Sequence, residues 1–140
     1  MVLELGVGLR RCASNPTYDK TYQQEEYDVT DLQNLMELPG ALAAFEFSDR
    51  GELGEHRIAA GSVLTASTLD LLCHVCVANI AIATMQARGW EQMTGAKGFY
   101  PIQGFTLVGF EWTAVATENR GVVMANDQAD YEQAYAALAG

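Results

Sequence analysis

The segment from Cys73 to Cys76 carries two thiols at a spacing that could do chemistry. A C-x-x-C pair can act as a redox dithiol or supply half of a metal site. Redox pairs lie at the start of a helix, where the dipole lowers the thiol pKa, whereas at least one turn of predicted helix precedes Cys73. A tetrahedral zinc site would need two further ligands besides these cysteines. The candidates His56 and Cys12 lie far apart in the sequence and do not form the closely spaced second pair that zinc sites usually have. We therefore favour core packing for both cysteines, with a redox or sulfur-handling dithiol as the alternative.

No other arrangement of residues points to catalysis. The sequence has no phosphate-binding Gly-Lys-Ser/Thr loop, no G-x-S-x-G elbow and no H-E-x-x-H pair. Glu46 and Glu111 are isolated carboxylates without a counterpart for acid–base work. We expect His74 on a polar helix face or at a dimer interface, and His56 on an exposed strand, rather than as a base or a metal ligand. The sequence thus predicts no catalytic, cofactor-binding or metal site, and a protein that is not an enzyme.

Composition and charge restrict the class of partner. The chain has 140 residues, 49% of them hydrophobic and 19% charged, which is ordinary for one folded domain. Its formal net charge of −10, with Lys and Arg numbering only 8, argues against nucleic acid and anionic membranes. We expect no membrane insertion, because no stretch approaches the roughly 18 uncharged apolar residues of a spanning helix. Three cysteines, an odd number, favour the cytoplasm.

The elements that must hold these residues follow from periodicity and turn signals. Residues 1–27 form a predicted N-terminal extension, and residues 28–140 form the domain. A short helix capped by Asp28 or Thr30 ends at Pro39-Gly40, and strands at 41–47 and 52–58 flank a turn with Gly51. A long helix spans 67–88 with Gly89 as its C-cap. Strands at 99–111, 112–117 and 121–125 precede a last helix capped by Asn126 or Asp127. The order α-β-β-α-β-β-β-α predicts an α+β fold, a five-stranded antiparallel sheet with helices on both faces.

The long helix carries two apolar stripes roughly a hundred degrees apart. One stripe holds Leu69, Leu72, Cys76, Ile80 and Ala83, and the other holds Leu71, Val75, Ala78, Ile82 and Met85. The sheet of the same chain can cover only one of them. A second copy of the chain is therefore the expected cover of the other stripe.

Aromatic residues gather after this helix, in the set Trp90, Phe99, Tyr100, Phe105, Phe110 and Trp112. We expect most of them in the core. Trp90 and Tyr100 flank a glycine-containing loop at 94–98, and these two are the predicted site for a partner or a small ligand.

Six short segments carry a family resemblance: Leu35–Ala41, Phe45–Gly51, Cys76–Asn79, Met85–Ala87, Pro101–Gly109 and Ala129–Tyr131. With these segments the chain resembles the roadblock/LC7 domain superfamily, and more narrowly its bacterial DUF2173 branch. The resemblance spans roughly residues 28–140. It implies a profilin-like sheet that pairs edge to edge with its twin, with the two long helices side by side.

The resemblance also implies a scaffold or regulator, often near small GTPases, although fold does not transmit function. The predicted dimer interface consists of Leu71, Val75, Ala78, Ile82, Met85 and Phe105. We therefore predict a homodimeric, non-enzymatic protein-binding scaffold or regulatory adaptor, with an unidentified protein as its further partner. The alternative is a thiol-based redox or sulfur-handling protein that uses Cys73 and Cys76.

Overall fold

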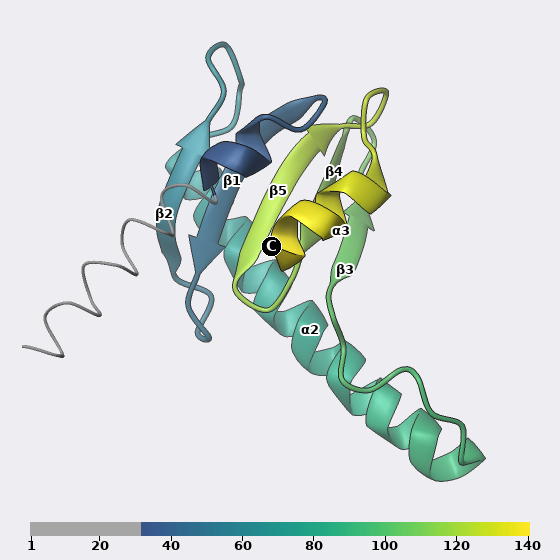
Figure 1. The fold of residues 1–140 in the computed structure, drawn as a ribbon. Helices are drawn as coiled ribbons and strands as arrows, with labels where there is room; N and C mark the ends of the chain where they lie inside the picture. Colours follow the sequence, from purple (N-terminus) through teal and green to yellow (C-terminus); the bar gives the residue numbers. More distant parts are fainter. Residues whose placement is uncertain (1–31) are drawn as a thin grey trace, which may run out of the picture. The chain divides into compact units, whose positions relative to one another are not determined.

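The computed structural model describes residues 32–140, which form a five-stranded antiparallel sheet with helices on both faces (Figure 1). The strands are β1 (Ala41–Phe47), β2 (Leu53–Ile58), β3 (Phe105–Val108), β4 (Trp112–Ala116) and β5 (Arg120–Ala125). The helices are α2 (Ala66–Thr94), α3 (Tyr131–Ala139) and a short helical segment at 32–36. The predicted α+β class and element order are confirmed. The predicted extension at 1–27 and the caps Asp28 and Thr30 lie outside the described residues.

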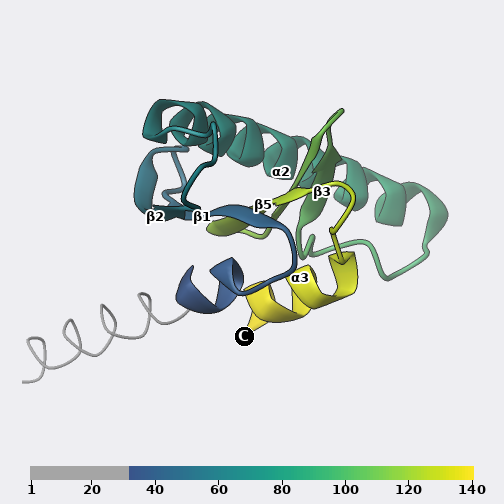
Figure 2. The same cartoon turned by 90° about the horizontal axis from the view of Figure 1, so that it is seen from above.

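The strands are arranged in the order β2-β1-β5-β4-β3, so β2 and β3 are the two edges of the sheet. The long helix α2 covers one face, and α3 with the segment 32–36 covers the other (Figure 2). Because the chain crosses from β2 to β3 through α2, the hairpin β1–β2 and the pair β3–β4 lie on opposite halves of the sheet. The helix α2 must therefore run across the sheet from one half to the other.

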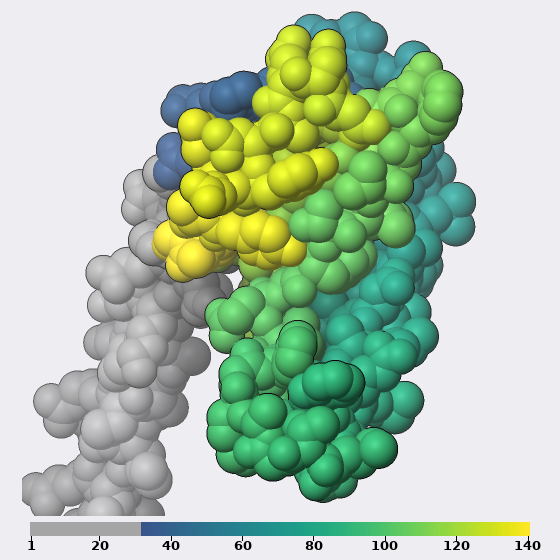
Figure 3. All heavy atoms as spheres, turned by 90° about the vertical axis from the view of Figure 1, so that its right-hand side faces the viewer, coloured from purple at the N-terminus to yellow at the C-terminus, as the bar shows by residue number. Residues whose placement is uncertain are grey.

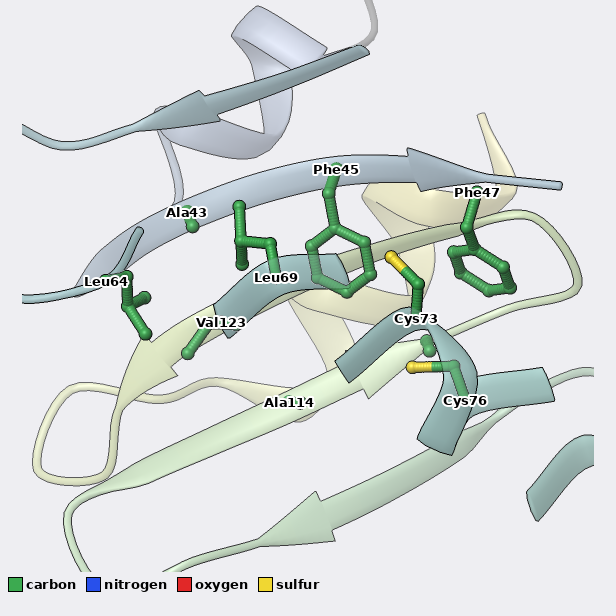
Figure 4. Packing of buried hydrophobic residues seen from close by; sticks show 10 residues of the cluster. Ala43, Phe45, Phe47, Leu64, Leu69, Cys73, Cys76, Ala114 and Val123 are labelled. Atoms are coloured by element: carbon green, nitrogen blue, oxygen red, sulfur yellow. The ribbon is translucent and has the colours of Figure 1, made fainter. Parts of the chain in front are cut away.

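Side-chain alternation along the strands creates a core on each face of the sheet. On the α2 side, Phe45 and Val123 pack with Leu69, Cys73 and Cys76 of the helix, as Figure 4 shows. The strand residues next in sequence to these point to the opposite face of the sheet, where they pack against α3 and the segment 32–36. That second cluster contains Leu32, Leu35, Ala44, Val115, Val122, Met124, Ala134 and Leu138. The sheet is thus buried on both faces and open only at its edges.

The β1–β2 turn requires glycine for two reasons. Gly51 has a φ of 85°, in the left-handed region that side chains disfavour. A Cβ at this position would also lie 2.5 Å from Nδ1 of His74 on α2. The backbone N–H of Leu53 then donates to Oδ1 of Asp70 at 3.1 Å, which ties the start of β2 to the same helix. The hairpin β1–β2 is therefore fastened to one flank of α2.

The prediction that α2 ends at Gly89 is wrong. The helix begins after Thr65, whose side chain accepts from the N–H of Thr68, and it ends at Gly95, which has a φ of 71°. A single glycine inside a long helix costs only about 1 kcal/mol, and nothing near Gly89 breaks the hydrogen-bond pattern. As a result, the C-terminal end of α2 runs past the sheet (Figure 1).

Two predicted boundaries on the C-terminal side are also wrong. The strand expected at 99–111 is limited to Phe105–Val108, because residues 95–104 run back along α2 before they reach the sheet. The last helix is capped by Asp130, whose side chain accepts from the N–H of Gln133, rather than by Asn126 or Asp127. The side chain of Asn126 is occupied by other hydrogen bonds, which hold the β3–β4 turn.

Within the described residues, α2 is also long and apolar enough to cross a membrane by length and composition, and an 18-residue stretch of it has a mean hydropathy of 1.6. The expectation that no stretch reaches this level is wrong, since no Asp, Glu, Lys or Arg lies between Asp70 and Arg88. The inner face of this helix packs on the sheet, so its apolar character has a structural role in the folded chain.

Candidate functional site: apolar surfaces for association

The outer face of α2 is an apolar surface that the rest of the described chain leaves uncovered. Leu71 is 68% exposed, Ile82 51% and Met85 70%, while Val75 and Ala78 are also exposed. By contrast, the first predicted stripe is buried or half-buried against the sheet, with Leu69 and Cys76 fully buried. Five of the predicted interface residues thus lie together on one helix face.

The two flanks of α2 face different halves of the sheet. Asp70 and His74 lie on the flank that contacts the β1–β2 hairpin, with His74 Nε2 3.7 Å from Asp70 Oδ2. At about 100° per residue, Val75 and Gln86 fall on the opposite flank. Because β3 is the edge opposite β2, that second flank faces the β3 side of the sheet.

The β3 edge is apolar and is not covered by another element of the described chain. Leu107 is 43% exposed and Val108 62%, and the edge lies between α2 and α3 in Figure 3. Phe105, a predicted interface residue, is half-buried and packs into the core beneath α2, so its side chain supports the edge from inside. The other edge, β2, instead exposes Glu55, His56 and Arg57. Charged side chains discourage strand addition at an edge, and β3 has none.

The predicted site at Trp90 and Tyr100 is a cluster at the C-terminal end of α2. Trp90 and Phe99 form an edge-to-face pair with ring centroids 5.9 Å apart. The guanidinium of Arg88 lies 4.7 Å from the centre of the Tyr100 ring, and its Nη2 donates to the Tyr100 hydroxyl at 2.8 Å. These contacts fix the returning segment 98–102 on the helix.

An apolar groove of about 280 Å³ opens beside this cluster, and we call it the Trp90 groove. It is lined by Ala83, Gln86, Ala87, Trp90, Phe99 and Ile102. Tyr100 does not line it, so the structure brings Trp90 and not Tyr100 into the groove. Gln86 places the groove on the flank of α2 that faces β3.

Sequence reasoning missed Phe110, which is 100% exposed in the β3–β4 turn. Asn126 holds this turn: its Nδ2 donates to the carbonyl oxygens of Gly109 at 2.9 Å and Phe110 at 3.1 Å. The backbone N–H of Asn126 donates to Glu111, and its Oδ1 accepts from the buried Thr113 hydroxyl at 2.6 Å. The signal in the sequence was Gly109 followed by only two residues before Trp112, which fits a two-residue hairpin loop.

The Cys73 and Cys76 thiols are free and fully buried. Burial and the nearby Asp70 carboxylate raise the pKa of Cys73 to about 11. Burial and the neighbouring Cys73 raise the pKa of Cys76 to about 12. A reactive dithiol needs the opposite, an accessible thiol with a lowered pKa. This geometry favours the core-packing interpretation of the pair. Among the described residues, no group of three or more His, Cys, Asp or Glu is placed to hold a metal.

Known proteins resemble this chain in sequence and in fold. The model of the family DUF2173, an uncharacterized conserved protein, matches residues 31–140. No curated protein matches the chain closely enough to count as a relative. The solved structure described as MglB with tetrameric arrangement has a TM-score of 0.60 and 19% identity, over 81% of this chain and 86% of that one.

Two further solved structures share the fold. The gliding protein MglB from Thermus thermophilus gives a TM-score of 0.60 at 19% identity, over 81% of this chain and 87% of that one. A roadblock/LC7 domain from Streptomyces avermitilis gives 0.56 at 12% identity, over 76% and 83%. The resemblance predicted from the short segments is confirmed: the chain belongs to the DUF2173 family and has the roadblock/LC7 fold.

Proposed function

We propose that this protein is a homodimeric, non-enzymatic scaffold or regulatory adaptor of the cytoplasm, which binds a second copy of itself and a further protein. The observation that carries the proposal is the pair of exposed apolar surfaces, the β3 edge and the outer face of α2. A water-soluble chain rarely leaves large apolar surfaces uncovered unless they are interaction sites.

The second copy fits the β3 edge best. An edge strand with free backbone groups and apolar side chains accepts another strand, and the charged β2 edge does not. Two β3 strands related by a two-fold axis would run antiparallel and would join the two sheets into one. Such an interface is isologous, so one surface serves both copies. The two α2 helices would then lie side by side, through the flank that carries Val75 and Ile82.

The remaining outer face of α2 is available for a different protein. Leu71 and Met85 point further from the β3 flank than Val75 does, at about 100° per residue along the helix. Both are strongly exposed. Leucine and methionine on one helix face form an adaptable apolar surface for a partner protein. The dimer would present two such surfaces.

Light scattering at micromolar concentration tests the homodimer. We expect a dimer for the wild type, and an Ile82→Glu variant whose dimer dissociation constant rises at least about a hundredfold, because dimerisation would bury an unpaired carboxylate. Ile82 is half-exposed, so the variant should fold with an unchanged circular dichroism spectrum. Val63→Glu is the matched control, since Val63 is 78% exposed and lies away from both surfaces, in the loop before α2. A wild-type protein that stays monomeric would contradict the proposal.

A further inference from the structure

We propose that Phe110 of each copy inserts into the Trp90 groove of the other copy. This inference rests on the proposed homodimer and specifies where its two copies interlock. The groove would then be a binding site that is complete only in the dimer, and its occupant would be an aromatic side chain of the same protein.

The inserting residue is exposed and held in place. An apolar ring that is fully exposed gains the most from a pocket, at roughly 25 cal/mol per Å² of area removed from water. The backbone around Phe110 is fixed by the hydrogen bonds of Asn126 to both sides of the turn. A rigid aromatic residue at the tip of a hairpin loses little conformational entropy on binding, which is typical of interface hot spots.

The receiving groove has a matching chemistry. Its walls are the rings of Trp90 and Phe99 and the aliphatic side chains of Ala83, Ala87 and Ile102. A third ring entering beside an existing edge-to-face pair can extend the same packing arrangement. The volume of about 280 Å³ accommodates one aromatic side chain rather than a folded peptide.

The strand register brings the two parts together. Phe110 follows the C-terminal end of β3, and Ile102 precedes its N-terminal end, so they lie beyond opposite ends of one short strand. In an antiparallel pair, the C-terminal end of one strand lies beside the N-terminal end of the other. Opposite residues of an antiparallel pair point to the same face, so the two-fold axis must pass through a residue of β3. With the axis at Leu107, the partner's Phe110 lies opposite Gly104 and diagonal to Ile102, within reach of an aromatic side chain. The partner's Glu111 then lies opposite Gln103. The groove also opens on the flank of α2 that faces this partner.

Engineered cross-linking tests the register. In a Cys12→Ser background, proteins carrying Glu111→Cys and Gln103→Cys are co-expressed, so that Phe110 and the walls of the groove are retained. We expect an intermolecular disulfide under mild oxidation in this mixture and none in either variant alone. Val63→Cys co-expressed with Glu111→Cys is the control, which should not cross-link. A wild-type dimer by light scattering without the Glu111–Gln103 cross-link would overturn this inference and leave the homodimer standing.

Alanine substitution tests the insertion itself. Phe110→Ala should raise the dimer dissociation constant at least about tenfold, whereas Val63→Ala should leave it unchanged. Trp90→Ala should have a comparable effect, and the double variant should lose less than the product of the two single losses, because the two residues form one contact. A Phe110→Ala dimer as tight as the wild type would overturn the inference. A double variant whose loss of affinity equals the product of the two single losses would also overturn it. A monomeric wild type would instead refute the proposed function on which it rests.

Discussion

The inner and outer faces of α2 have similar apolar composition and opposite surroundings. Leu69 and Leu71 are two residues apart on the same helix, yet the first is completely buried and the second is 68% exposed. The inner face is covered by the sheet of the same chain and stabilises the fold. Within the described chain, the outer face packs on no sheet and adds no such stabilisation to the fold. The difference shows that folding of the described chain uses only one side of the helix, which leaves the other side free for the association proposed above.

Truncation of the two leucines should separate these roles most clearly. Leu69→Ala should lower the free energy of unfolding by about 2–5 kcal/mol, because it leaves a cavity under the sheet. Leu71→Ala should change it by less than about 0.5 kcal/mol. Urea denaturation at low protein concentration, followed by circular dichroism, measures both. Equal losses for the two variants would contradict the division between the faces.

Periodicity in the sequence was enough to predict this division, because both stripes repeat at helical spacing from Leu69 to Met85. The position of the helix end was less predictable. Gly89 reads as a stop signal, but a glycine ends a helix only where the chain also turns, and the chain turns at Gly95. The exposed Phe110 could not be found from its type, because aromatic residues are usually buried and its exposure depends on hydrogen bonds from Asn126. Contacts between residues far apart in sequence therefore account for most of what was missed.

Gly89 allows a second, smaller test of the outer face. A Cβ at Gly89 would meet no atom within 4 Å, and helical glycine is less stable than alanine. Gly89→Ala should raise the free energy of unfolding by about 0.5–1 kcal/mol. The added methyl group meets no atom of the chain and lies outside the Trp90 groove, so light scattering should show unchanged dimerisation. Weaker dimerisation would instead show that the second copy packs closely against this end of α2.

The thiols of the inner face should make stability depend on alkaline pH. Their pKa values in the folded state, about 11 for Cys73 and about 12 for Cys76, lie above the ordinary value of 9.0. Below pH 9 the thiols are protonated in both states and their full contribution to stability is present. Above pH 9 the unfolded chain loses these protons first, so the free energy of unfolding falls as the pH rises towards the folded values.

Urea denaturation between pH 8 and pH 11 measures this loss, in a Cys12→Ser background. A Cys73→Ala and Cys76→Ala variant is the control, and it should be less stable at pH 8 but decline less steeply. The comparison of slopes removes the contribution of other groups that titrate in this range. Parallel slopes would show that the two thiols ionise as easily in the folded chain as in the unfolded one. In that case the pair would be accessible enough for redox chemistry, and the helix face that packs on the sheet could no longer be assigned to folding alone.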